Sequence, residues 1–170
     1  MPGDAAPCVS DDLIIRPAVP GEHRLAADVM VEARARAEID GTMPPGCHGP
    51  EAVEAWMRDV VLPDREVYVA TADEQAVGLL VLDTAWLDQL HVRPTWWRRG
   101  VATTLLSLAK ALRPQGFGLW VFEVNTPARR LYERGGLVVV RRTDGRDNEE
   151  RAPDVAYAWQ PPGGARLADD

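Results

Sequence analysis

One segment, residues 87–124, constrains the fold of this chain more than any other. It contains a strand-like run (LDQLHV), a turn that begins at Pro94, an apolar helix pattern and a second strand-like run (LWVFEV). The helix pattern places Val101, Leu105 and Leu108 on one face. Two strands of one sheet that are joined through a helix run parallel, and their connection is right-handed. The segment therefore predicts one parallel strand pair in the sheet.

The remaining chain alternates between strand and helix patterns. Strands are expected at residues 13–16, 65–74, 75–83, 137–142 and 155–159, and helices at residues 22–40, 50–61 and 127–134. The strand-like segments between residues 65 and 92 are joined by short polar turns, which is typical of an antiparallel meander. This order predicts an α/β (α+β) fold: a central mixed, mostly antiparallel sheet of six to seven strands, with about four helices on both faces.

The size of the chain suits one domain. Its 170 residues, 46% of them hydrophobic, can form one substantial core but are few for two. Both ends are rich in Pro, Gly and Asp, so we expect flexible arms at residues 1–12 and 161–170. Residues 13–160 are therefore predicted to form a single folded domain.

Charge and cysteine usage limit the classes of partner. The net charge of −7 disfavours nonspecific binding to nucleic acid or to an anionic membrane, and it suits a cationic small molecule. There is no apolar run near eighteen residues and no signal-peptide pattern, so a cytoplasmic protein is expected. Cys8 and Cys47 lack metal-ligand spacing, which predicts two reduced thiols and no metal site.

The turn at residues 93–100 is rich in arginine, although the protein as a whole is acidic, and a helix is expected to begin directly after it. A helix that begins near Gly100 leaves backbone N–H groups unpaired at its positive end, and such a helix start can bind an anion. Gly100 permits close approach and Ala102 is small, while Arg98 and Arg99 add positive charge. The turn therefore predicts a phosphate site, although the same turn could simply cap the helix. It matches neither a Walker A loop nor the GxGxxG pattern.

A second junction, FEVNTPARRLYERGG, lies at residues 122–136. Thr126 can cap a helix whose first residue is Pro127, which would leave the Asn125 amide free. Tyr132 lies on the same helix face as Ala128. Taken alone, Tyr132 fits a functional tyrosine and a half-buried packing residue equally well.

Together, LHVRPTWWRRGVATTLL and NTPARRLYERGGL resemble motifs A and B of the GNAT superfamily of acyl-CoA-dependent N-acyltransferases. The resemblance covers residues 13–159, and it implies acetyl-CoA (coenzyme A) as co-substrate. The family pattern Q/R-x-x-G-x-G/A falls on residues 97–102, where Trp97 replaces the usual polar or basic residue. The residues that the resemblance assigns to the cofactor are Leu90, His91, Val92, Trp97, Arg98, Arg99, Gly100, Val101, Ala102, Thr103, Asn125, Arg129 and Tyr132.

The resemblance also divides these residues by role. The amides of residues 98–103 would bind the pyrophosphate, and the backbone of residues 90–92 would pair with the pantetheine arm as an added strand would. Asn125 would contact that arm, Arg129 would reach the nucleotide end, and Tyr132 would lie at the thioester sulfur. Because Trp97 departs from the pattern, any side-chain contact made there in relatives is in question.

Tyr132 and Asp88 are the predicted catalytic residues. Tyr132 suits a hydrogen bond to the departing thiolate, and a backbone N–H near residues 90–92 suits the oxyanion. Asp88 occupies the position of the acidic residue in relatives that read E-x-L-x-V, so it could recognise the amine or act as a general base through water. Strand alternation places Trp86, Asp88, Leu90 and Val92 on one face; a bulge would bring in His91 instead.

The acceptor is expected to be an amine, small and cationic. In GNAT proteins the first two helices and the loop before the last strand form the acceptor side, and both regions are rich in carboxylates, among them Glu38 and Glu149. The candidate acceptor residues are Asp40, Trp86, Asp88, Glu150 and Asp154. Solvated loops and, for Trp86, core packing are the alternative interpretations.

The function predicted from these features is acetyl transfer from acetyl-CoA to a primary amine of a small molecule or protein, by direct attack. The alternatives are a catalytically silent acyl-CoA-binding or regulatory module and a GNAT-fold enzyme that uses another acyl group or decarboxylates. Either a monomer or a homodimer is compatible with the sequence.

Overall fold

The computed structural model describes residues 12–163, so the predicted arms at 1–12 and 161–170 lie almost entirely outside the described part. The strands are β1 (Ile14–Pro17), β2 (Glu66–Ala72), β3 (Gln75–Leu82), β4 (Leu87–Val92), β5 (Phe117–Phe122), β6 (Val138–Thr143) and β7 (Asp154–Trp159). The helices are α1 (His23–Ile39), α2 (Pro50–Trp56), the π-helix η1 (Met57–Val61), α3 (Leu62–Asp64), the 3-10 helix η2 (Pro94–Trp96), α4 (Val101–Leu112) and α5 (Thr126–Arg134). The predicted mixed α/β order is confirmed.

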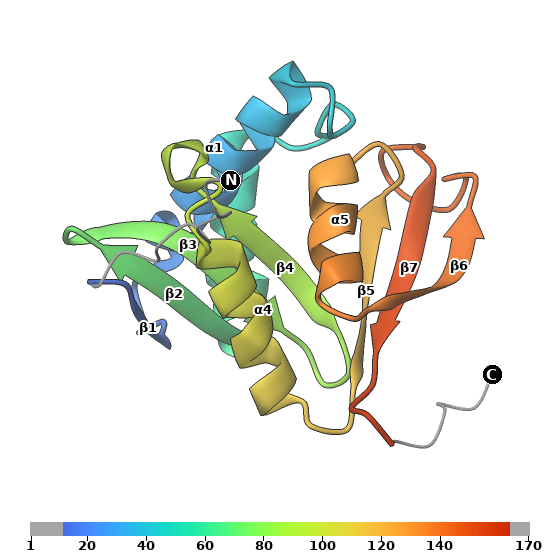
Figure 1. Ribbon diagram of the computed structural model, residues 1–170. Helices are drawn as coiled ribbons and strands as arrows, with labels where there is room; N and C mark the ends of the chain where they lie inside the picture. Colours follow the sequence, from blue (N-terminus) through green and yellow to red (C-terminus); the bar gives the residue numbers. More distant parts are fainter. Residues whose placement is uncertain (1–11, 164–170) are drawn as a thin grey trace, which may run out of the picture.

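The strands form two antiparallel sheets, β1-β2-β3-β4 and β5-β7-β6. The predicted parallel pair, β4 and β5, meets at a single bridge between Trp86 and Gly118, next to which the Gly118 N–H donates to the Ala85 carbonyl at 2.9 Å. Beyond this bridge the two strands diverge, and Figure 1 shows the V-shaped arrangement that results. The bridge needs a glycine, because a Cβ at Gly118 would lie 2.8 Å from the Trp86 ring.

Helices cover both faces of the first sheet, as predicted. On one face, α1, α2 and η1 bury Val29, Met57 and Val61 against Leu79 and Val81. On the other face, α4 buries a second apolar cluster. Figure 1 shows α4 and α5 on the same side of the two sheets, and Lys110 of α4 donates a hydrogen bond to the Gly135 carbonyl at the end of α5. The two helices α4 and α5 therefore flank the opening between the diverging strands β4 and β5.

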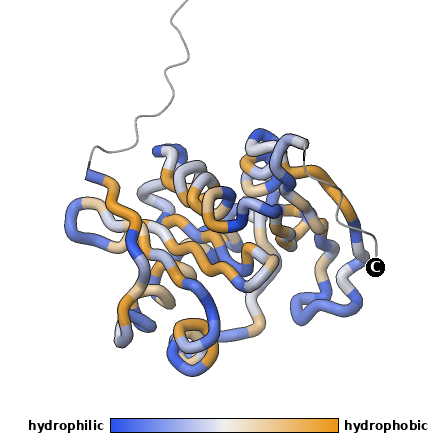
Figure 2. Tube along the Cα trace, turned by 90° about the horizontal axis from the view of Figure 1, so that it is seen from below, coloured by the Kyte–Doolittle hydropathy of each residue, from blue (hydrophilic) through white to orange (hydrophobic). Residues whose placement is uncertain are grey.

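The strand β3 is the centre of this arrangement. Seven of its eight residues are buried, because helices lie on both of its faces. This explains why QAVGLLVL is a continuous apolar run and not an alternating one. Figure 2 shows mostly hydrophobic colour on the strands in the middle of the molecule and mostly hydrophilic colour on connections at its rim.

The second predicted helix is longer than expected. The prediction ended it at Val61, two residues before Pro63, which lacks the N–H that a helix interior needs. In the structure the helical path continues to Asp64 through η1, whose wider turn is closed by the Leu62 N–H donating to the Met57 carbonyl. Among residues 12–163, no helix is both long enough and apolar enough to cross a membrane.

Candidate active site

The strand β4 presents an open edge where β5 has diverged. The Arg93 N–H donates to the Val77 carbonyl at 2.8 Å, and the register pairs His91 with Leu79. In an antiparallel ladder, alternate residues direct both backbone groups toward the partner strand. Leu90 and Val92 therefore direct their N–H and C=O groups away from β3, into the V. This edge can pair with an extended, amide-bearing ligand as an added strand would.

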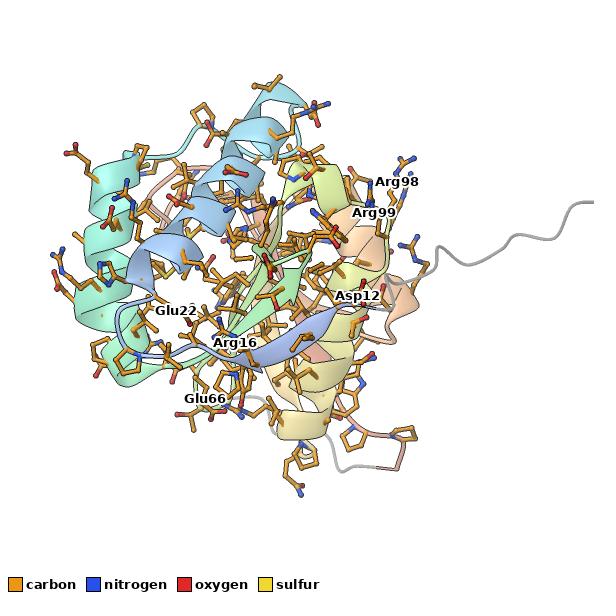
Figure 3. The ribbon with its side chains drawn as sticks, turned by 90° about the vertical axis from the view of Figure 1, so that its left-hand side faces the viewer. Asp12, Arg16, Glu22, Glu66, Arg98 and Arg99 are labelled. Carbon is orange, nitrogen blue, oxygen red and sulfur yellow. The ribbon has the colours of Figure 1, made fainter. Side chains whose placement is uncertain are left out.

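The start of α4 is an uncapped helix end beside this edge. Gly100 precedes the helix with a φ of 82°, no side chain caps it, and the first helical hydrogen bond runs from the Thr104 N–H to the Gly100 carbonyl. The N–H groups of residues 101–103 consequently lack partners within the helix. Arg98 and Arg99 project outward at this corner (Figure 3). The arrangement can bind a phosphate, with donors from the backbone and positive charge from the side chains.

Two neighbouring tryptophans are placed differently between the edge and the helix start. The Trp96 ring packs against the core, and the Arg99 guanidinium lies over this ring, 4.9 Å from the ring centroid. The Trp97 indole N–H donates instead to the Val92 carbonyl at 2.7 Å. Trp97, the residue that departs from the GNAT pattern, therefore contacts the open edge of β4 itself.

The cap of α5 differs from the prediction. Asn125, not Thr126, caps the helix, and its Oδ1 accepts the Ala128 N–H at 3.2 Å. Thr126 already has helical geometry, and its hydroxyl donates to the Val124 carbonyl at 3.4 Å. The prediction was wrong because Pro127 can occupy the second helical position as well as the first. The Asn125 oxygen is therefore engaged, which leaves its amide N–H₂ group as the part that can contact a ligand.

Tyr132 of α5 is nearly buried and belongs to the same apolar cluster as Leu90 and Val92. Its ring lies 6.0 Å from the Tyr157 ring. Burial raises the pKa of the Tyr132 hydroxyl above its ordinary value, so the hydroxyl stays protonated and can donate a hydrogen bond. Within residues 12–163 it has no hydrogen-bond partner, whereas the Tyr157 hydroxyl donates to Glu133 at 2.6 Å.

Arg129 makes contacts within the protein. Its Nε donates to the Tyr157 hydroxyl at 3.1 Å, and another guanidinium nitrogen donates to the Glu123 carbonyl at 3.1 Å. To reach a nucleotide, the guanidinium would have to give up these partners or extend a remaining N–H group. Its assignment to the nucleotide end stays a prediction.

A bulge at Asp88 interrupts the alternation of β4. Leu87 pairs with Leu82, but Gln89 pairs with Val81, so Asp88 is an extra residue. Simple alternation, which put Leu87 on the opposite face from Leu90 and Val92, is therefore wrong. Leu87 joins the cluster on the α4 side instead, and the bulge that the sequence left open as an alternative is present.

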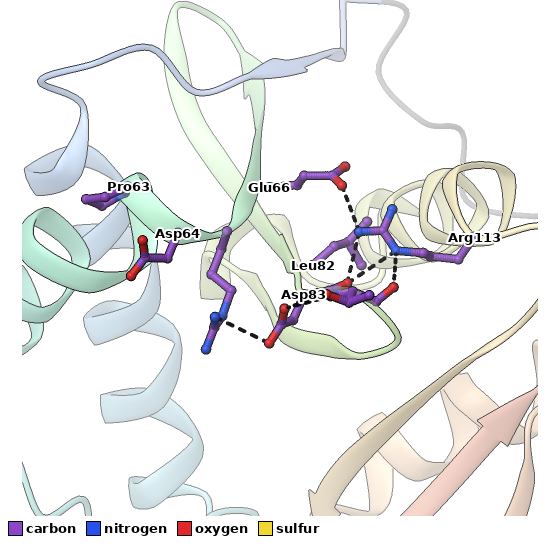
Figure 4. A pocket seen from close by; sticks show the side chains of 8 residues that line it. Pro63, Asp64, Glu66, Leu82, Asp83 and Arg113 are labelled. Atoms are coloured by element: carbon purple, nitrogen blue, oxygen red, sulfur yellow. Dashed lines mark hydrogen bonds and ion pairs between the residues drawn. The ribbon is translucent and has the colours of Figure 1, made fainter.

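Asp88 lies at the beginning of β4, where it is exposed, with the Arg65 Nε at 3.8 Å. Desolvation raises the pKa of its carboxyl above the ordinary value; Arg65 lowers that pKa and Asp83 raises it. Arg65 and Asp83 also line a surface pocket of about 560 Å³, in which Arg113 holds Glu66 at 2.9 Å (Figure 4). No hydrogen bond joins Asp88 and Tyr132 within the described residues.

His91 faces the opposite side of β4 from Leu90. Its Nε2 is 2.8 Å from the Gln89 Oε1. Burial, followed by the positive charge of Arg34, lowers the pKa of the imidazole to about 3. His91 is therefore uncharged at neutral pH.

Two loops far apart in the sequence meet beside α1. Arg34 contacts Glu150 at 3.2 Å, His48 contacts Glu149 at 2.9 Å, and the Cys47 thiol lies 3.5 Å from the Glu149 carbonyl. They border a pocket of about 230 Å³. It is lined by Met30, Val31, Arg34, Ala35, Glu38, Gly46, Cys47, His48, Pro50, Val53 and Glu150. Cys47 is exposed and forms no disulfide within residues 12–163, and Cys8 lies outside them, so the two reduced thiols stay a prediction.

A family model described as the acetyltransferase (GNAT) family matches residues 33–136, which include both junctions. The chain belongs to the GNAT acetyltransferase family. It is therefore an acyltransferase, as the two sequence motifs predicted. None of the curated protein sequences matches this chain.

Solved structures of low identity share the GNAT fold. Apo YjaB from Escherichia coli is 22% identical with a TM-score of 0.69, covering 90% of this chain and 99% of YjaB. PaiA N-acetyltransferase from Thermoplasma acidophilum, in complex with coenzyme A, is 17% identical with a TM-score of 0.67, covering 87% and 98%. Arabidopsis thaliana NAA60, in complex with a bisubstrate analogue, is 18% identical with a TM-score of 0.60, covering 87% and 97%.

GNAT enzymes use acetyl-CoA, and the residues present here fit such a molecule. Its pyrophosphate needs several N–H donors and positive charge, which the start of α4 offers. Its pantetheine arm contains amides, for which the open edge of β4 offers backbone donors and acceptors. The two features adjoin, so one molecule can reach both.

The predicted acceptor residues of this GNAT chain are not all together. Glu150 lines the pocket beside α1. Asp40 pairs with Arg36 at 2.9 Å, and Asp154 accepts from Asn148 at 3.0 Å. Trp86 packs over Gly118 where the sheets join. Glu150 is the one member of the predicted set with a side chain at this pocket.

Two charged residues of the pocket, Arg34 and His48, were missed as acceptor candidates, whereas Glu38 was among the carboxylates of the predicted acceptor side. Arg34 and Glu38 follow Val31 at the i+3 and i+7 positions of α1, so a pocket-facing stripe could have been found from helix spacing. No local sequence pattern marked His48, because the residue that it contacts, Glu149, lies 101 residues away in the sequence.

Proposed function

We propose that this GNAT enzyme transfers the acetyl group of acetyl-CoA to a primary amine by direct attack. The observation that carries the proposal is the open edge of β4 beside the uncapped start of α4, with the Tyr132 hydroxyl in the adjoining cluster. Donor binding would use the backbone of residues 90–92 and 98–103, with Arg98 and Arg99 compensating phosphate charge. The Asn125 amide would contact the donor's arm.

The chain's groups can supply the parts of acyl transfer. A free N–H of Leu90 or Val92 can stabilise the oxyanion, because it is fixed in the strand before the reaction begins. The protonated Tyr132 hydroxyl can donate to the departing sulfur. Reference pKa values near 10 for tyrosine and 8.5 for a thiol make full proton transfer uphill by roughly 2 kcal/mol, and burial raises that cost further. We therefore assign Tyr132 a hydrogen bond to the thiolate and not complete protonation.

Asp88 is the proposed base, acting through water. It lies two residues from Leu90, about 7 Å along the strand, so a bridging water is needed. Partial desolvation raises the pKa of its carboxyl, which makes Asp88 a stronger base than an aspartate with an ordinary pKa. His91 is the weaker candidate, since the pKa of its imidazole is lowered to about 3.

The pocket beside α1 is the proposed acceptor site. Arg34 contacts Glu150 of the β6–β7 loop at 3.2 Å, and its charge lowers the pKa of His91 on β4, the strand that would hold the donor. Glu38 and Glu150 carry two negative charges against one on Arg34, while Met30, Val31 and Val53 supply apolar surface. One uncompensated negative charge favours an acceptor with an apolar body and a cationic group.

Replacing Glu150 with Gln is expected to raise the KM for a cationic amine about tenfold, equivalent to roughly 1.4 kcal/mol. The change removes one carboxylate, so the charges of Glu38 and Arg34 balance and a cation no longer meets a net negative charge. The kcat and the KM for acetyl-CoA should stay within twofold. Steady-state kinetics at varied amine concentration measure this effect. Asp147→Asn, an exposed change in the same loop, is the matched control; an equal effect of both variants would contradict the acceptor site.

The function itself is tested by two measurements on the whole chain. Calorimetry with coenzyme A determines whether the donor binds, and thiol release determines whether it turns over with amines. Coenzyme A binding without turnover on any amine would favour the silent acyl-CoA-binding module. Faster turnover with another acyl-CoA would favour the enzyme of different acyl specificity. The single domain at 13–160, the cytoplasmic location and the monomeric or homodimeric state stay predictions.

A further inference from the structure

The Trp97 indole is hydrogen-bonded to the backbone carbonyl at the end of the open edge of β4. The Nε1–H donates to the Val92 oxygen at 2.7 Å, and the Trp97 side chain remains partly exposed. Val92 directs this carbonyl away from β3, because the next residue, Arg93, forms the hydrogen bond to Val77. Within residues 12–163, this is the one hydrogen bond made to the edge that Leu90 and Val92 leave open.

The position of the indole is fixed by the turn before α4. Trp97 has an extended backbone (φ −63°, ψ 149°), and Arg98 has a φ of 60° that reverses the chain toward Gly100. This turn directs the indole back along β4 while the backbone continues into the helix. The neighbouring Trp96 packs in the core under Arg99, so the two tryptophans have separate roles.

We propose that the Trp97 indole competes with the acyl donor for the Val92 carbonyl. The inference rests on the proposed function. A donor with phosphates at the start of α4 and a thioester near Leu90 must pass Val92. An amide N–H in its arm needs an acceptor there, and the Val92 oxygen is the one on that edge nearest to the helix start. The indole holds this oxygen in the free enzyme and leaves it when the donor binds, with its N–H returning to solvent.

This competition lowers donor affinity by the value of one hydrogen bond. Such a bond changes an equilibrium by about three- to tenfold. Trp97→Phe keeps an aromatic ring but removes the N–H, so coenzyme A should bind about three- to tenfold more tightly. The nucleotide half alone, 3′-phosphoadenosine 5′-diphosphate, has no arm, and its Kd should stay within twofold. Calorimetry with the two ligands measures both values.

Trp96→Phe is the matched control, because it disturbs the stacking of Arg99 and leaves the Val92 contact intact. It should shift the affinity of both ligands alike. Selective tightening of coenzyme A in this control, or an equal or weaker coenzyme A affinity in Trp97→Phe, would overturn the competition.

A second measurement uses the unmodified sequence and needs no variant to fold. The indole N–H of Trp97, assigned by through-bond NMR, should lose its hydrogen-bonded shift when coenzyme A is added and keep it when the nucleotide half is added. Coenzyme A binding with an unmoved Trp97 signal would overturn this inference alone. The absence of coenzyme A binding would overturn the proposed function and this inference together.

Discussion

Gly100→Asp is expected to weaken coenzyme A binding at least about 100-fold. Gly100 precedes α4 in a left-handed conformation beside the unpaired N–H groups of residues 101–103. An aspartate there would cap those N–H groups with its own carboxylate and would repel a phosphate. Like charges a few ångströms apart in a partly solvated site cost about 3 kcal/mol, which corresponds to the expected loss. Calorimetry with coenzyme A measures it.

Gly100→Asn is the control for backbone strain. Asparagine has nearly the same shape, tolerates the left-handed conformation and carries no charge. It should weaken binding by no more than about tenfold, while both variants retain similar melting temperatures. If the aspartate variant binds coenzyme A as tightly as the unmodified chain, the start of α4 does not hold the pyrophosphate.

Tyr132→Phe is expected to lower kcat about 100-fold while the Kd for coenzyme A changes by less than twofold. The hydroxyl is kept protonated by burial and has no partner within the described residues, so it is free to donate to the departing sulfur. A hydrogen bond that forms in the transition state contributes to kcat and not to ground-state binding. Single-turnover thiol release and calorimetry separate the two quantities.

Tyr157→Phe makes the same chemical change on the adjacent ring. Its hydroxyl is already engaged by Arg129 and Glu133, so this variant should lose thermal stability and keep kcat within about threefold. Equal losses of kcat in both variants would indicate a packing effect. An unchanged kcat in Tyr132→Phe would remove Tyr132 from the proposed mechanism.

The element order could be predicted because each element carries a local pattern. Gly41 after the first helix, Pro94 before α4 and the alternating or continuous apolar runs are read from neighbouring residues alone. The uncapped start of α4 was also predictable, since Gly100 and the basic residues before it stand next to one another in the sequence.

The opening between β4 and β5 could not be predicted from such patterns. Its extent depends on where the two strands touch, and that point is a tertiary contact between Trp86 and Gly118. The bulge at Asp88 likewise depends on how β4 registers against β3. A single extra residue there was enough to break the predicted alternation, and it places Leu87 in the same cluster as Leu90 and Val92.

The proposed acceptor pocket was still harder to predict, because it is formed by residues that are far apart in the sequence. Arg34 and Glu150 are 116 residues apart, and nothing in either local sequence marks them as a pair. The role of Trp97 was hidden for a different reason. A tryptophan in a turn is consistent with many packings, and only its indole contact with Val92 distinguishes one of them.

The measurement that tests the central claim most directly is turnover of acetyl-CoA with a panel of primary amines, read out by thiol release and by the mass of the product. The proposed function predicts a product heavier by one acetyl group, formed fastest from amines that carry a cationic group on an apolar body. It also predicts that this product fails to form with Gly100→Asp. Tight binding of coenzyme A without an acetylated product from any small amine or peptide amine would contradict the claim that this chain is an N-acetyltransferase.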